Sequence, residues 1–143
     1  MPYRFLEDVA TADIAFEASG QTLEEVFTAS AEATLNVMIE ELETVEPREE
    51  RQVSLTDSSL DMLLFNFLQE IIFYKDAEQM LLRVTDCRIV ETDGEFRVTA
   101  RGQGERLDQA RHRQRVDVKA VTLHQFRLER AGSGWRAHVI LDI

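Results

Sequence analysis

Residues 58–74, SSLDMLLFNFLQEIIFY, carry apolar side chains almost all the way round a helix. The main stripe recurs at spacings of three and four residues, which is the period of an α-helix. It comprises Leu60, Leu63, Leu64, Phe67, Leu68, Ile71 and Ile72. A helix with so wide an apolar surface must be covered on several sides, so we predict a central helix here, capped by Ser58 and Asp61.

A second amphipathic helix is predicted from Thr22 to Leu42. Thr22 and Glu25 fit a capping box, in which the hydroxyl accepts from a free amide and the glutamate reaches back. Most of the remaining chain alternates with period two, which is typical of strands. We expect strands over residues 12–18, 52–56, 82–90, 95–101, 116–129 and 135–142, with hairpin turns at 92–94 and 131–134. This order predicts an α+β fold: one domain, residues 1–143, with two helices on one face of a mostly antiparallel sheet.

The composition excludes several classes of protein. The formal net charge is −11; residues 1–50 hold 13 acidic and 2 basic side chains, whereas residues 101–143 hold 5 acidic and 9 basic. Such an acidic chain is a poor sequence-independent binder of nucleic acid. The single Cys87 cannot form an internal disulfide, and the first residues lack the pattern of a signal peptide. We therefore expect a soluble cytoplasmic protein that does not enter a membrane.

Catalytic motifs are sparse. The sequence contains no phosphate-binding loop, HExxH motif or nucleophile elbow, and Gly102-Gln103-Gly104 is expected in a turn rather than in a dinucleotide site. His112, His124 and His138 lack the spacing of zinc ligands, so we interpret them as surface or edge residues. Cys87 is expected to pack within a strand.

Residues 101–115, RGQGERLDQARHRQR, contain five arginines. Arginine forks bind phosphates and carboxylates equally well. This segment is either a solvated loop that offsets the acidic part of the chain, or a surface for an acidic partner or an RNA backbone. We assign any local RNA contact to Arg106–Arg115.

Acidic groups gather at the end of the last predicted strand. By alternation Asp142 lies on the face away from the core, and the terminal carboxylate of Ile143 follows it directly. Asp13 would reach the same place if the first and last strands are neighbours. Three oxygen donors without sulfur or imidazole would select Ca²⁺, Mg²⁺ or Mn²⁺. The alternative is a set of solvated acids.

Several motifs, in order along nearly the whole chain, resemble the archease family. They are Thr11-Ala12-Asp13, Gly20-x-Thr22-Leu23-Glu24-Glu25-x-Phe27, Asp61-x-Leu63-Leu64-x-x-x-Leu68-x-Glu70, Gly104-Glu105 with Asp108 and His112, Val118-Lys119-Ala120-Val121-Thr122-x-His124, and Trp135 with Val139–Ile143. One departure is Ala10, where the family usually has histidine; Asp8 could compensate for its absence.

The resemblance implies a non-enzymatic accessory protein for the RtcB-type RNA ligase, which takes part in tRNA splicing and RNA repair. It implies that the chain promotes guanylylation and turnover of the ligase and broadens its use of nucleotides. The family's metal site, typically calcium, corresponds to Asp13, Asp142 and Ile143, with Lys119 and His124 as residues facing the partner or a phosphate. The alternatives are a chaperone-like modulator of an enzyme such as a tRNA methyltransferase, and a metal-dependent phosphohydrolase. The oligomeric state stays open.

Overall fold

The computed structural model describes residues 2–6 and 13–143. Its elements are β1 (Tyr3–Leu6), β2 (Asp13–Gly20), α1 (Leu23–Met38), a short 3₁₀ helix (Leu42–Thr44), β3 (Glu49–Asp57), α2 (Leu60–Glu78), β4 (Met80–Thr92), β5 (Glu95–Arg106), β6 (Ala120–Ala131) and β7 (Gly134–Asp142). Two helices and antiparallel strands confirm the predicted α+β class. No helix in this described part is long and apolar enough to cross a membrane.

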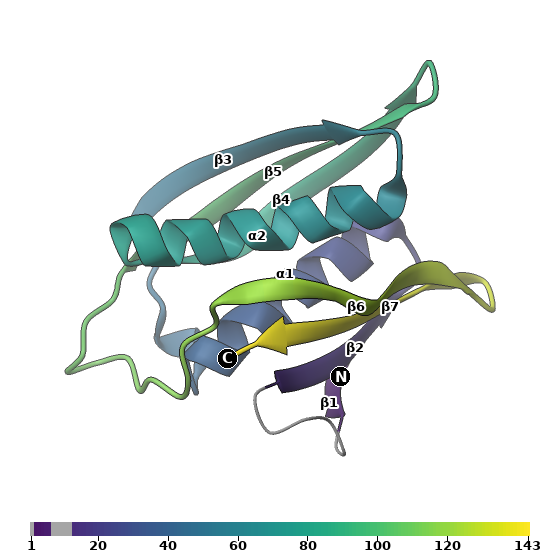
Figure 1. Cartoon of the computed structure of the whole chain (residues 1–143). Coiled ribbons are helices and arrows are strands. Elements are labelled where there is room, and N and C mark those ends of the chain that lie inside the picture. The colour runs from purple at the N-terminus through teal and green to yellow at the C-terminus, as the bar shows by residue number, and fades with distance from the viewer. Residues whose placement is uncertain (1, 7–12) are drawn as a thin grey trace.

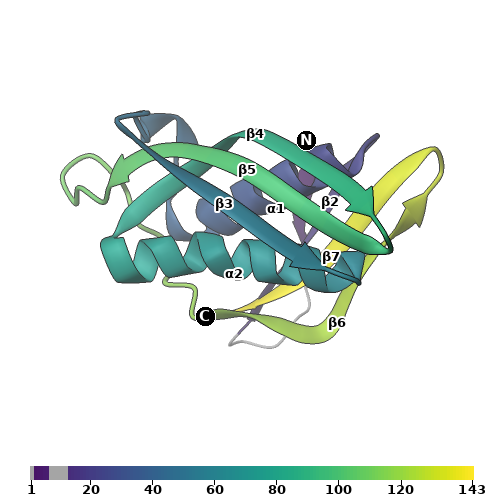
Figure 2. The same ribbon diagram turned by 90° about the horizontal axis from the view of Figure 1, so that it is seen from above.

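The strands form two sheets rather than the single sheet that we expected. One has the order β1-β2-β7-β6 and the other the order β3-β5-β4, and all strand pairs are antiparallel. The helices lie between the sheets, and each touches both (Figures 1 and 2). Helix α2 therefore packs against a sheet on each of two sides, which explains why its apolar stripe is so wide.

Helix α2 forms the centre of the core, as its sequence predicts. Leu63, Leu64 and Phe67 are fully buried, and the rings of Phe67 and Phe27 lie 5.5 Å apart. The cap is Ser59, whose hydroxyl accepts from the N–H of Met62, so the assignment to Ser58 was wrong by one residue. The helix also continues beyond the predicted end, to Glu78.

Helix α1 confirms the predicted capping box. The hydroxyl of Thr22 accepts from the N–H of Glu25 at 3.1 Å, and the Glu25 carboxylate accepts from the N–H of Gln21 at 3.1 Å. The helix ends at Met38 rather than at Leu42, which belongs to the 3₁₀ turn. Asn36 closes this end, because its side-chain amide donates to the carbonyls of Ile39 and Glu40, the first two residues after the helix.

Two strand assignments needed correction. Strand β1 was not predicted, and Gly102-Gln103-Gly104 lies inside β5 instead of a turn. Gly104 is required by packing: a Cβ atom there would overlap the carbonyl of Leu81 on β4. The predicted hairpin turns are both present, with positive φ at Asp93, Gly94 and Gly132.

Candidate functional site

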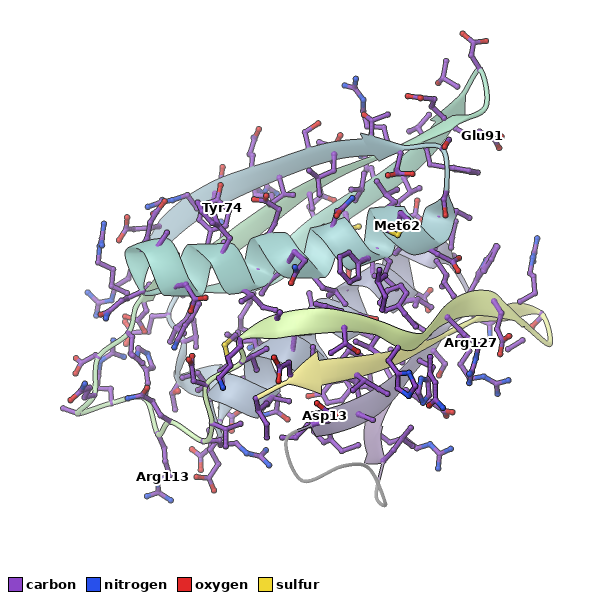
Figure 3. The ribbon with its side chains drawn as sticks, in the orientation of Figure 1. Asp13, Met62, Tyr74, Glu91, Arg113 and Arg127 are labelled. Atoms are coloured by element: carbon purple, nitrogen blue, oxygen red, sulfur yellow. The ribbon has the colours of Figure 1, made fainter. Side chains whose placement is uncertain are left out.

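Asp13 and Asp142 are direct partners across two antiparallel strands. Asp13 is the first residue of β2, Asp142 is the last residue of β7, and the backbone register places one opposite the other. Figure 3 shows Asp13 beside the end of β7. Side chains of facing residues point to the same side of a sheet, with Cβ atoms roughly 4.5–5.5 Å apart. The chain thus holds two half-buried carboxylates together at one edge of the sheet.

The acidic pair lies on the face of the sheet turned away from the helices. In β7, Val139 and Leu141 belong to the hydrophobic core, so Ile140 and Asp142 occupy the opposite face, as predicted. The next pair on that face is Ala15 and Ile140, and both are buried. A buried apolar floor beside the carboxylates reduces their access to water on that side, which strengthens any electrostatic interaction that they make.

Lys119 is fixed at the same edge by its backbone. Its N–H donates to the carbonyl of Asp142 at 2.8 Å, and the next residue, Ala120, is the strand partner of Asp142. Ile143 follows directly. The structure therefore brings Asp13, Asp142, Ile143 and Lys119 to one place.

His124 lies elsewhere on β6. It is exposed, within an irregular stretch between Thr122 and Arg127 where the register with β7 shifts. The other histidine of this sheet, His138 on β7, donates from its Nδ1–H to the carbonyl of Gln125, the residue after His124, at 2.9 Å. His124 is thus separated from the acidic pair by several residues of strand.

The donor chemistry at the acidic pair suits a hard divalent cation. Like charges directly opposite in a sheet repel each other, and a bound cation would relieve this cost. Among the described residues, no three His, Cys, Asp or Glu side chains form a metal-binding group. A cation at this edge would therefore need main-chain oxygen as well, and Ile143 is next to Asp142. Asp8 and Ala10 lie outside the described residues.

A second polar cluster, which we did not predict, surrounds Glu105. This carboxylate is 4% exposed and accepts from the N–H of Glu46 at 2.8 Å and from the guanidinium of Arg111. Burial raises its pKa, but hydrogen bonds from Arg111, the Glu46 amide and His112 outweigh that effect and lower the pKa to about 2. Glu105 is therefore a charged residue inside the protein.

His112 completes this cluster and is buried, so its interpretation as a surface residue was wrong. Its Nδ1 accepts from the N–H of Asp108 at 2.8 Å, and its Nε2 lies 2.9 Å from Glu105. Because a backbone amide can only donate, the proton of the neutral ring is on Nε2. The ring therefore ties the irregular segment after β5 to the strand. The feature of the sequence that could have indicated this cluster is the Gly104-Glu105 motif followed by Asp108 and His112.

The arginines of residues 101–115 are largely paired within the chain. The pairs are Arg101 with Glu50, Arg106 with Glu49, Arg111 with Glu105, and Arg113 with Glu40. Arg115 instead lies over the ring of Phe5, with its guanidinium carbon 5.9 Å from the ring centre. This pairing favours the structural interpretation of the segment over a free cationic surface, and RNA contact through Arg106–Arg115 stays a prediction.

Taken together, these features define a small α+β protein with two helices enclosed by antiparallel sheets and a carboxylate pair at one sheet edge. The model of the archease protein family matches residues 3–143. The chain therefore belongs to the archease family.

Individual relatives agree with this assignment. Protein archease of Thermococcus gammatolerans is 37% identical over 134 residues, which cover 93% of this chain and 94% of that protein. The solution structure of Methanobacterium thermoautotrophicum protein 1598 has a TM-score of 0.86 at 34% identity and covers 99% of both chains. The crystal structure of an archease from Thermotoga maritima, called a possible chaperone, has a TM-score of 0.61 at 21% identity, covers 98% of both chains and supports the fold alone.

Proposed function

We propose that this protein is a non-catalytic activator of an RtcB-type RNA ligase and that it acts through the edge formed by Asp13 and Asp142. The observation that carries the proposal is the register of β2 and β7, which places these two carboxylates opposite each other. Membership in the archease family supports the choice of partner. Through this edge the protein would promote guanylylation of the ligase in tRNA splicing and RNA repair, and broaden its use of nucleotides.

The residues at this edge fit a divalent cation. Asp13, Asp142 and a main-chain oxygen of Ile143 would hold Ca²⁺, with Mg²⁺ or Mn²⁺ as alternatives. When bound, such an ion supplies positive charge that can bind phosphate oxygens. The protein's own contribution is to hold both carboxylates on the rim of a rigid sheet and to place Lys119 beside them through its bond to Asp142. Lys119 and His124 are the residues that we propose face the ligase or a phosphate.

The test is transfer of radiolabelled guanylate from GTP to the ligase, measured with and without this protein. Wild-type protein is expected to accelerate transfer and multiple-turnover ligation, and Asp13→Asn and Asp142→Asn are expected to abolish both effects. Asp93→Asn is the matched control, because Asp93 lies in the hairpin turn between β4 and β5 and asparagine tolerates its positive φ. Equal acceleration by all variants would contradict the proposal.

Two further assays separate the alternatives. A chaperone-like role toward a tRNA methyltransferase would change the solubility and specificity of that enzyme and leave guanylate transfer unaffected. A metal-dependent phosphohydrolase would cleave a generic phosphodiester without any partner, and a chelator would stop the reaction. Either result would replace ligase activation as the function.

A further inference from the structure

Strand β6 forms one edge of its sheet and carries an unusually large bulge. Thr122 pairs with Ile140 and Arg127 pairs with His138, so the four residues 123–126 lie opposite the single residue Val139. Bulges at sheet edges interrupt the ladder and redirect side chains. A second copy of this chain could not add a continuous strand here, so this edge does not suit self-association by strand pairing.

The bulge is held in one conformation. Phe126 packs edge-to-face on Phe65 of α2, with ring centres 5.6 Å apart, and the His138 ring binds the carbonyl of Gln125. Gln125 has φ +54, a left-handed conformation that costs free energy for a residue with a Cβ atom. Strain that is locked by surrounding contacts is typical of functional segments.

This bulge presents the most exposed large apolar side chain of the described residues, Leu123, at 61%. Leu123 lies between two residues that touch α2: the N–H of Val121 donates to Gln69, and Phe126 contacts Phe65. Leu123 is exposed although residues on both sides of it contact α2, so the bulge turns this side chain outward.

A second exposed apolar residue lies further along the same junction. Phe73 of α2 is 55% exposed and lies between Gln69, which binds Val121, and Lys75, which binds Asp117 at 2.9 Å. Phe73 is therefore level with the segment that contains Lys119. Val116, also exposed, precedes Asp117. Helix α2 and strand β6 run side by side (Figure 1). We call Phe73, Val116, Lys119 and Leu123 the α2–β6 surface.

We propose that the α2–β6 surface is the docking surface for the ligase, with Leu123 and Phe73 inserting into apolar depressions on that protein. The inference rests on the proposed function, which supplies the partner. The surface adjoins the carboxylate edge, because the backbone N–H of Lys119 donates to the carbonyl of Asp142. A partner that receives the carboxylate edge would therefore meet these apolar side chains next. A few well-packed side chains near the centre of an interface contribute most of its affinity, and aromatic residues such as phenylalanine are enriched in interfaces.

The experiment measures binding of the full chain to immobilised ligase for Leu123→Ser and Phe73→Ser. The matched control is Val90→Ser, since Val90 is also 55% exposed but lies on β4 of the other sheet. We expect each α2–β6 variant to raise Kd at least about fivefold, and Val90→Ser to change it less than about twofold. Leu123→Met should retain wild-type affinity because it keeps an apolar side chain of similar size.

A second readout does not depend on serine substitutions. Burial raises the pKa of the Cys87 thiol to about 12, with smaller contributions from Glu24 and Asp86, so that thiol reacts slowly. A maleimide will therefore label the thiol introduced by Leu123→Cys. We expect the ligase to slow this labelling, and not to slow labelling in Val90→Cys.

The outcomes separate the two proposals. If wild-type protein activates the ligase but Leu123→Ser and Phe73→Ser bind as tightly as Val90→Ser, the docking surface is wrong and the proposed function stands. If wild-type protein neither binds nor activates the ligase, the proposed function fails and the docking inference fails with it. If these variants weaken binding to RNA and not to the ligase, the surface is an RNA contact and the inference is overturned.

Discussion

The imidazole of His112 lies with Nε2 2.9 Å from the carboxylate of Glu105, and this contact joins an irregular segment to the end of β5. The other ring nitrogen accepts from the Asp108 amide, so both nitrogens have partners within the protein. Arg48 and Arg111 approach the same carboxylate from the solvent side. The Glu105 carboxylate thus holds the segment after β5 in place through its contacts with Arg111 and His112.

Glu105→Gln should lower the free energy of unfolding by about 2–4 kcal/mol, because it leaves buried donors facing a neutral amide. The measurement is urea denaturation at pH 7. Glu129→Gln is the matched control: Glu129 is also a strand residue with an arginine partner, Arg136 at 3.6 Å, but the pair is exposed. That control should change stability by less than about 0.5 kcal/mol. Similar losses in both variants would contradict a special role for Glu105.

The same cluster predicts a dependence of stability on acid. The folded protein lowers the pKa of Glu105 from 4.5 to about 2, so in this range the unfolded chain binds more protons than the folded one. The stabilisation from Glu105 is fully present above about pH 5 and is lost as pH falls toward 2. Glu105→Gln should therefore show a flatter fall of unfolding free energy between pH 5 and pH 2. Parallel curves for both proteins would exclude Glu105 as the source.

Elements with a strong period were predictable from sequence, whereas their limits depended on neighbours. The apolar stripe of α2 and the capping box of α1 depend on local spacing, and both were found where expected. The strand predicted from residue 116 begins instead at Ala120, because its neighbour β7 ends opposite that residue at Asp142. The division into two sheets also depends on pairing between distant strands, which alternation does not encode.

The candidate site divides in the same way. Asp13 and Asp142 could be placed together because each lies at a strand end on a polar face, and only the pairing of their two strands, β2 and β7, had to be assumed. The Glu105 cluster could not be placed, since its glutamate and histidine are joined across a segment without periodicity. The bulge of β6 could not be predicted from the sequence either, because Leu123 fits the alternation of a regular strand.

Gly104→Ala should destabilise the protein by more than about 3 kcal/mol or prevent folding. The added methyl group would overlap the main chain at Leu81, where two paired strands cannot move apart without losing their hydrogen bonds. Gly102→Ala is the comparison, since its methyl group would lie 3.3 Å from the Cβ atom of Leu82, a tight contact that a shift of a few tenths of an ångström relieves. Its expected cost is about 1 kcal/mol. Thermal unfolding of both variants checks the order, and a Gly104→Ala protein as stable as Gly102→Ala would contradict the packing argument.

Asp142→Asn should have opposite effects on stability with and without a divalent cation. In chelator, the variant loses the repulsion between Asp142 and Asp13, which is worth about 0.2–1 kcal/mol, so its Tm should rise by about 1–3 °C. In Ca²⁺ at a hundred times its Kd, wild-type protein should gain about 2.7 kcal/mol from binding, and the variant should gain almost nothing. The two melting curves therefore exchange order when the ion is added.

Calorimetry in chelator, Ca²⁺, Mg²⁺ and Mn²⁺ measures this exchange and identifies the ion that stabilises most. Asp93→Asn removes one charge at the far hairpin and should follow wild-type protein in every condition. Equal cation-dependent gains in wild-type protein and Asp142→Asn would show that any ion binds elsewhere. Because the measurement needs no ligase, it tests the carboxylate pair separately from the proposed activation: a pair that binds a cation with no effect on guanylate transfer would be a structural site only.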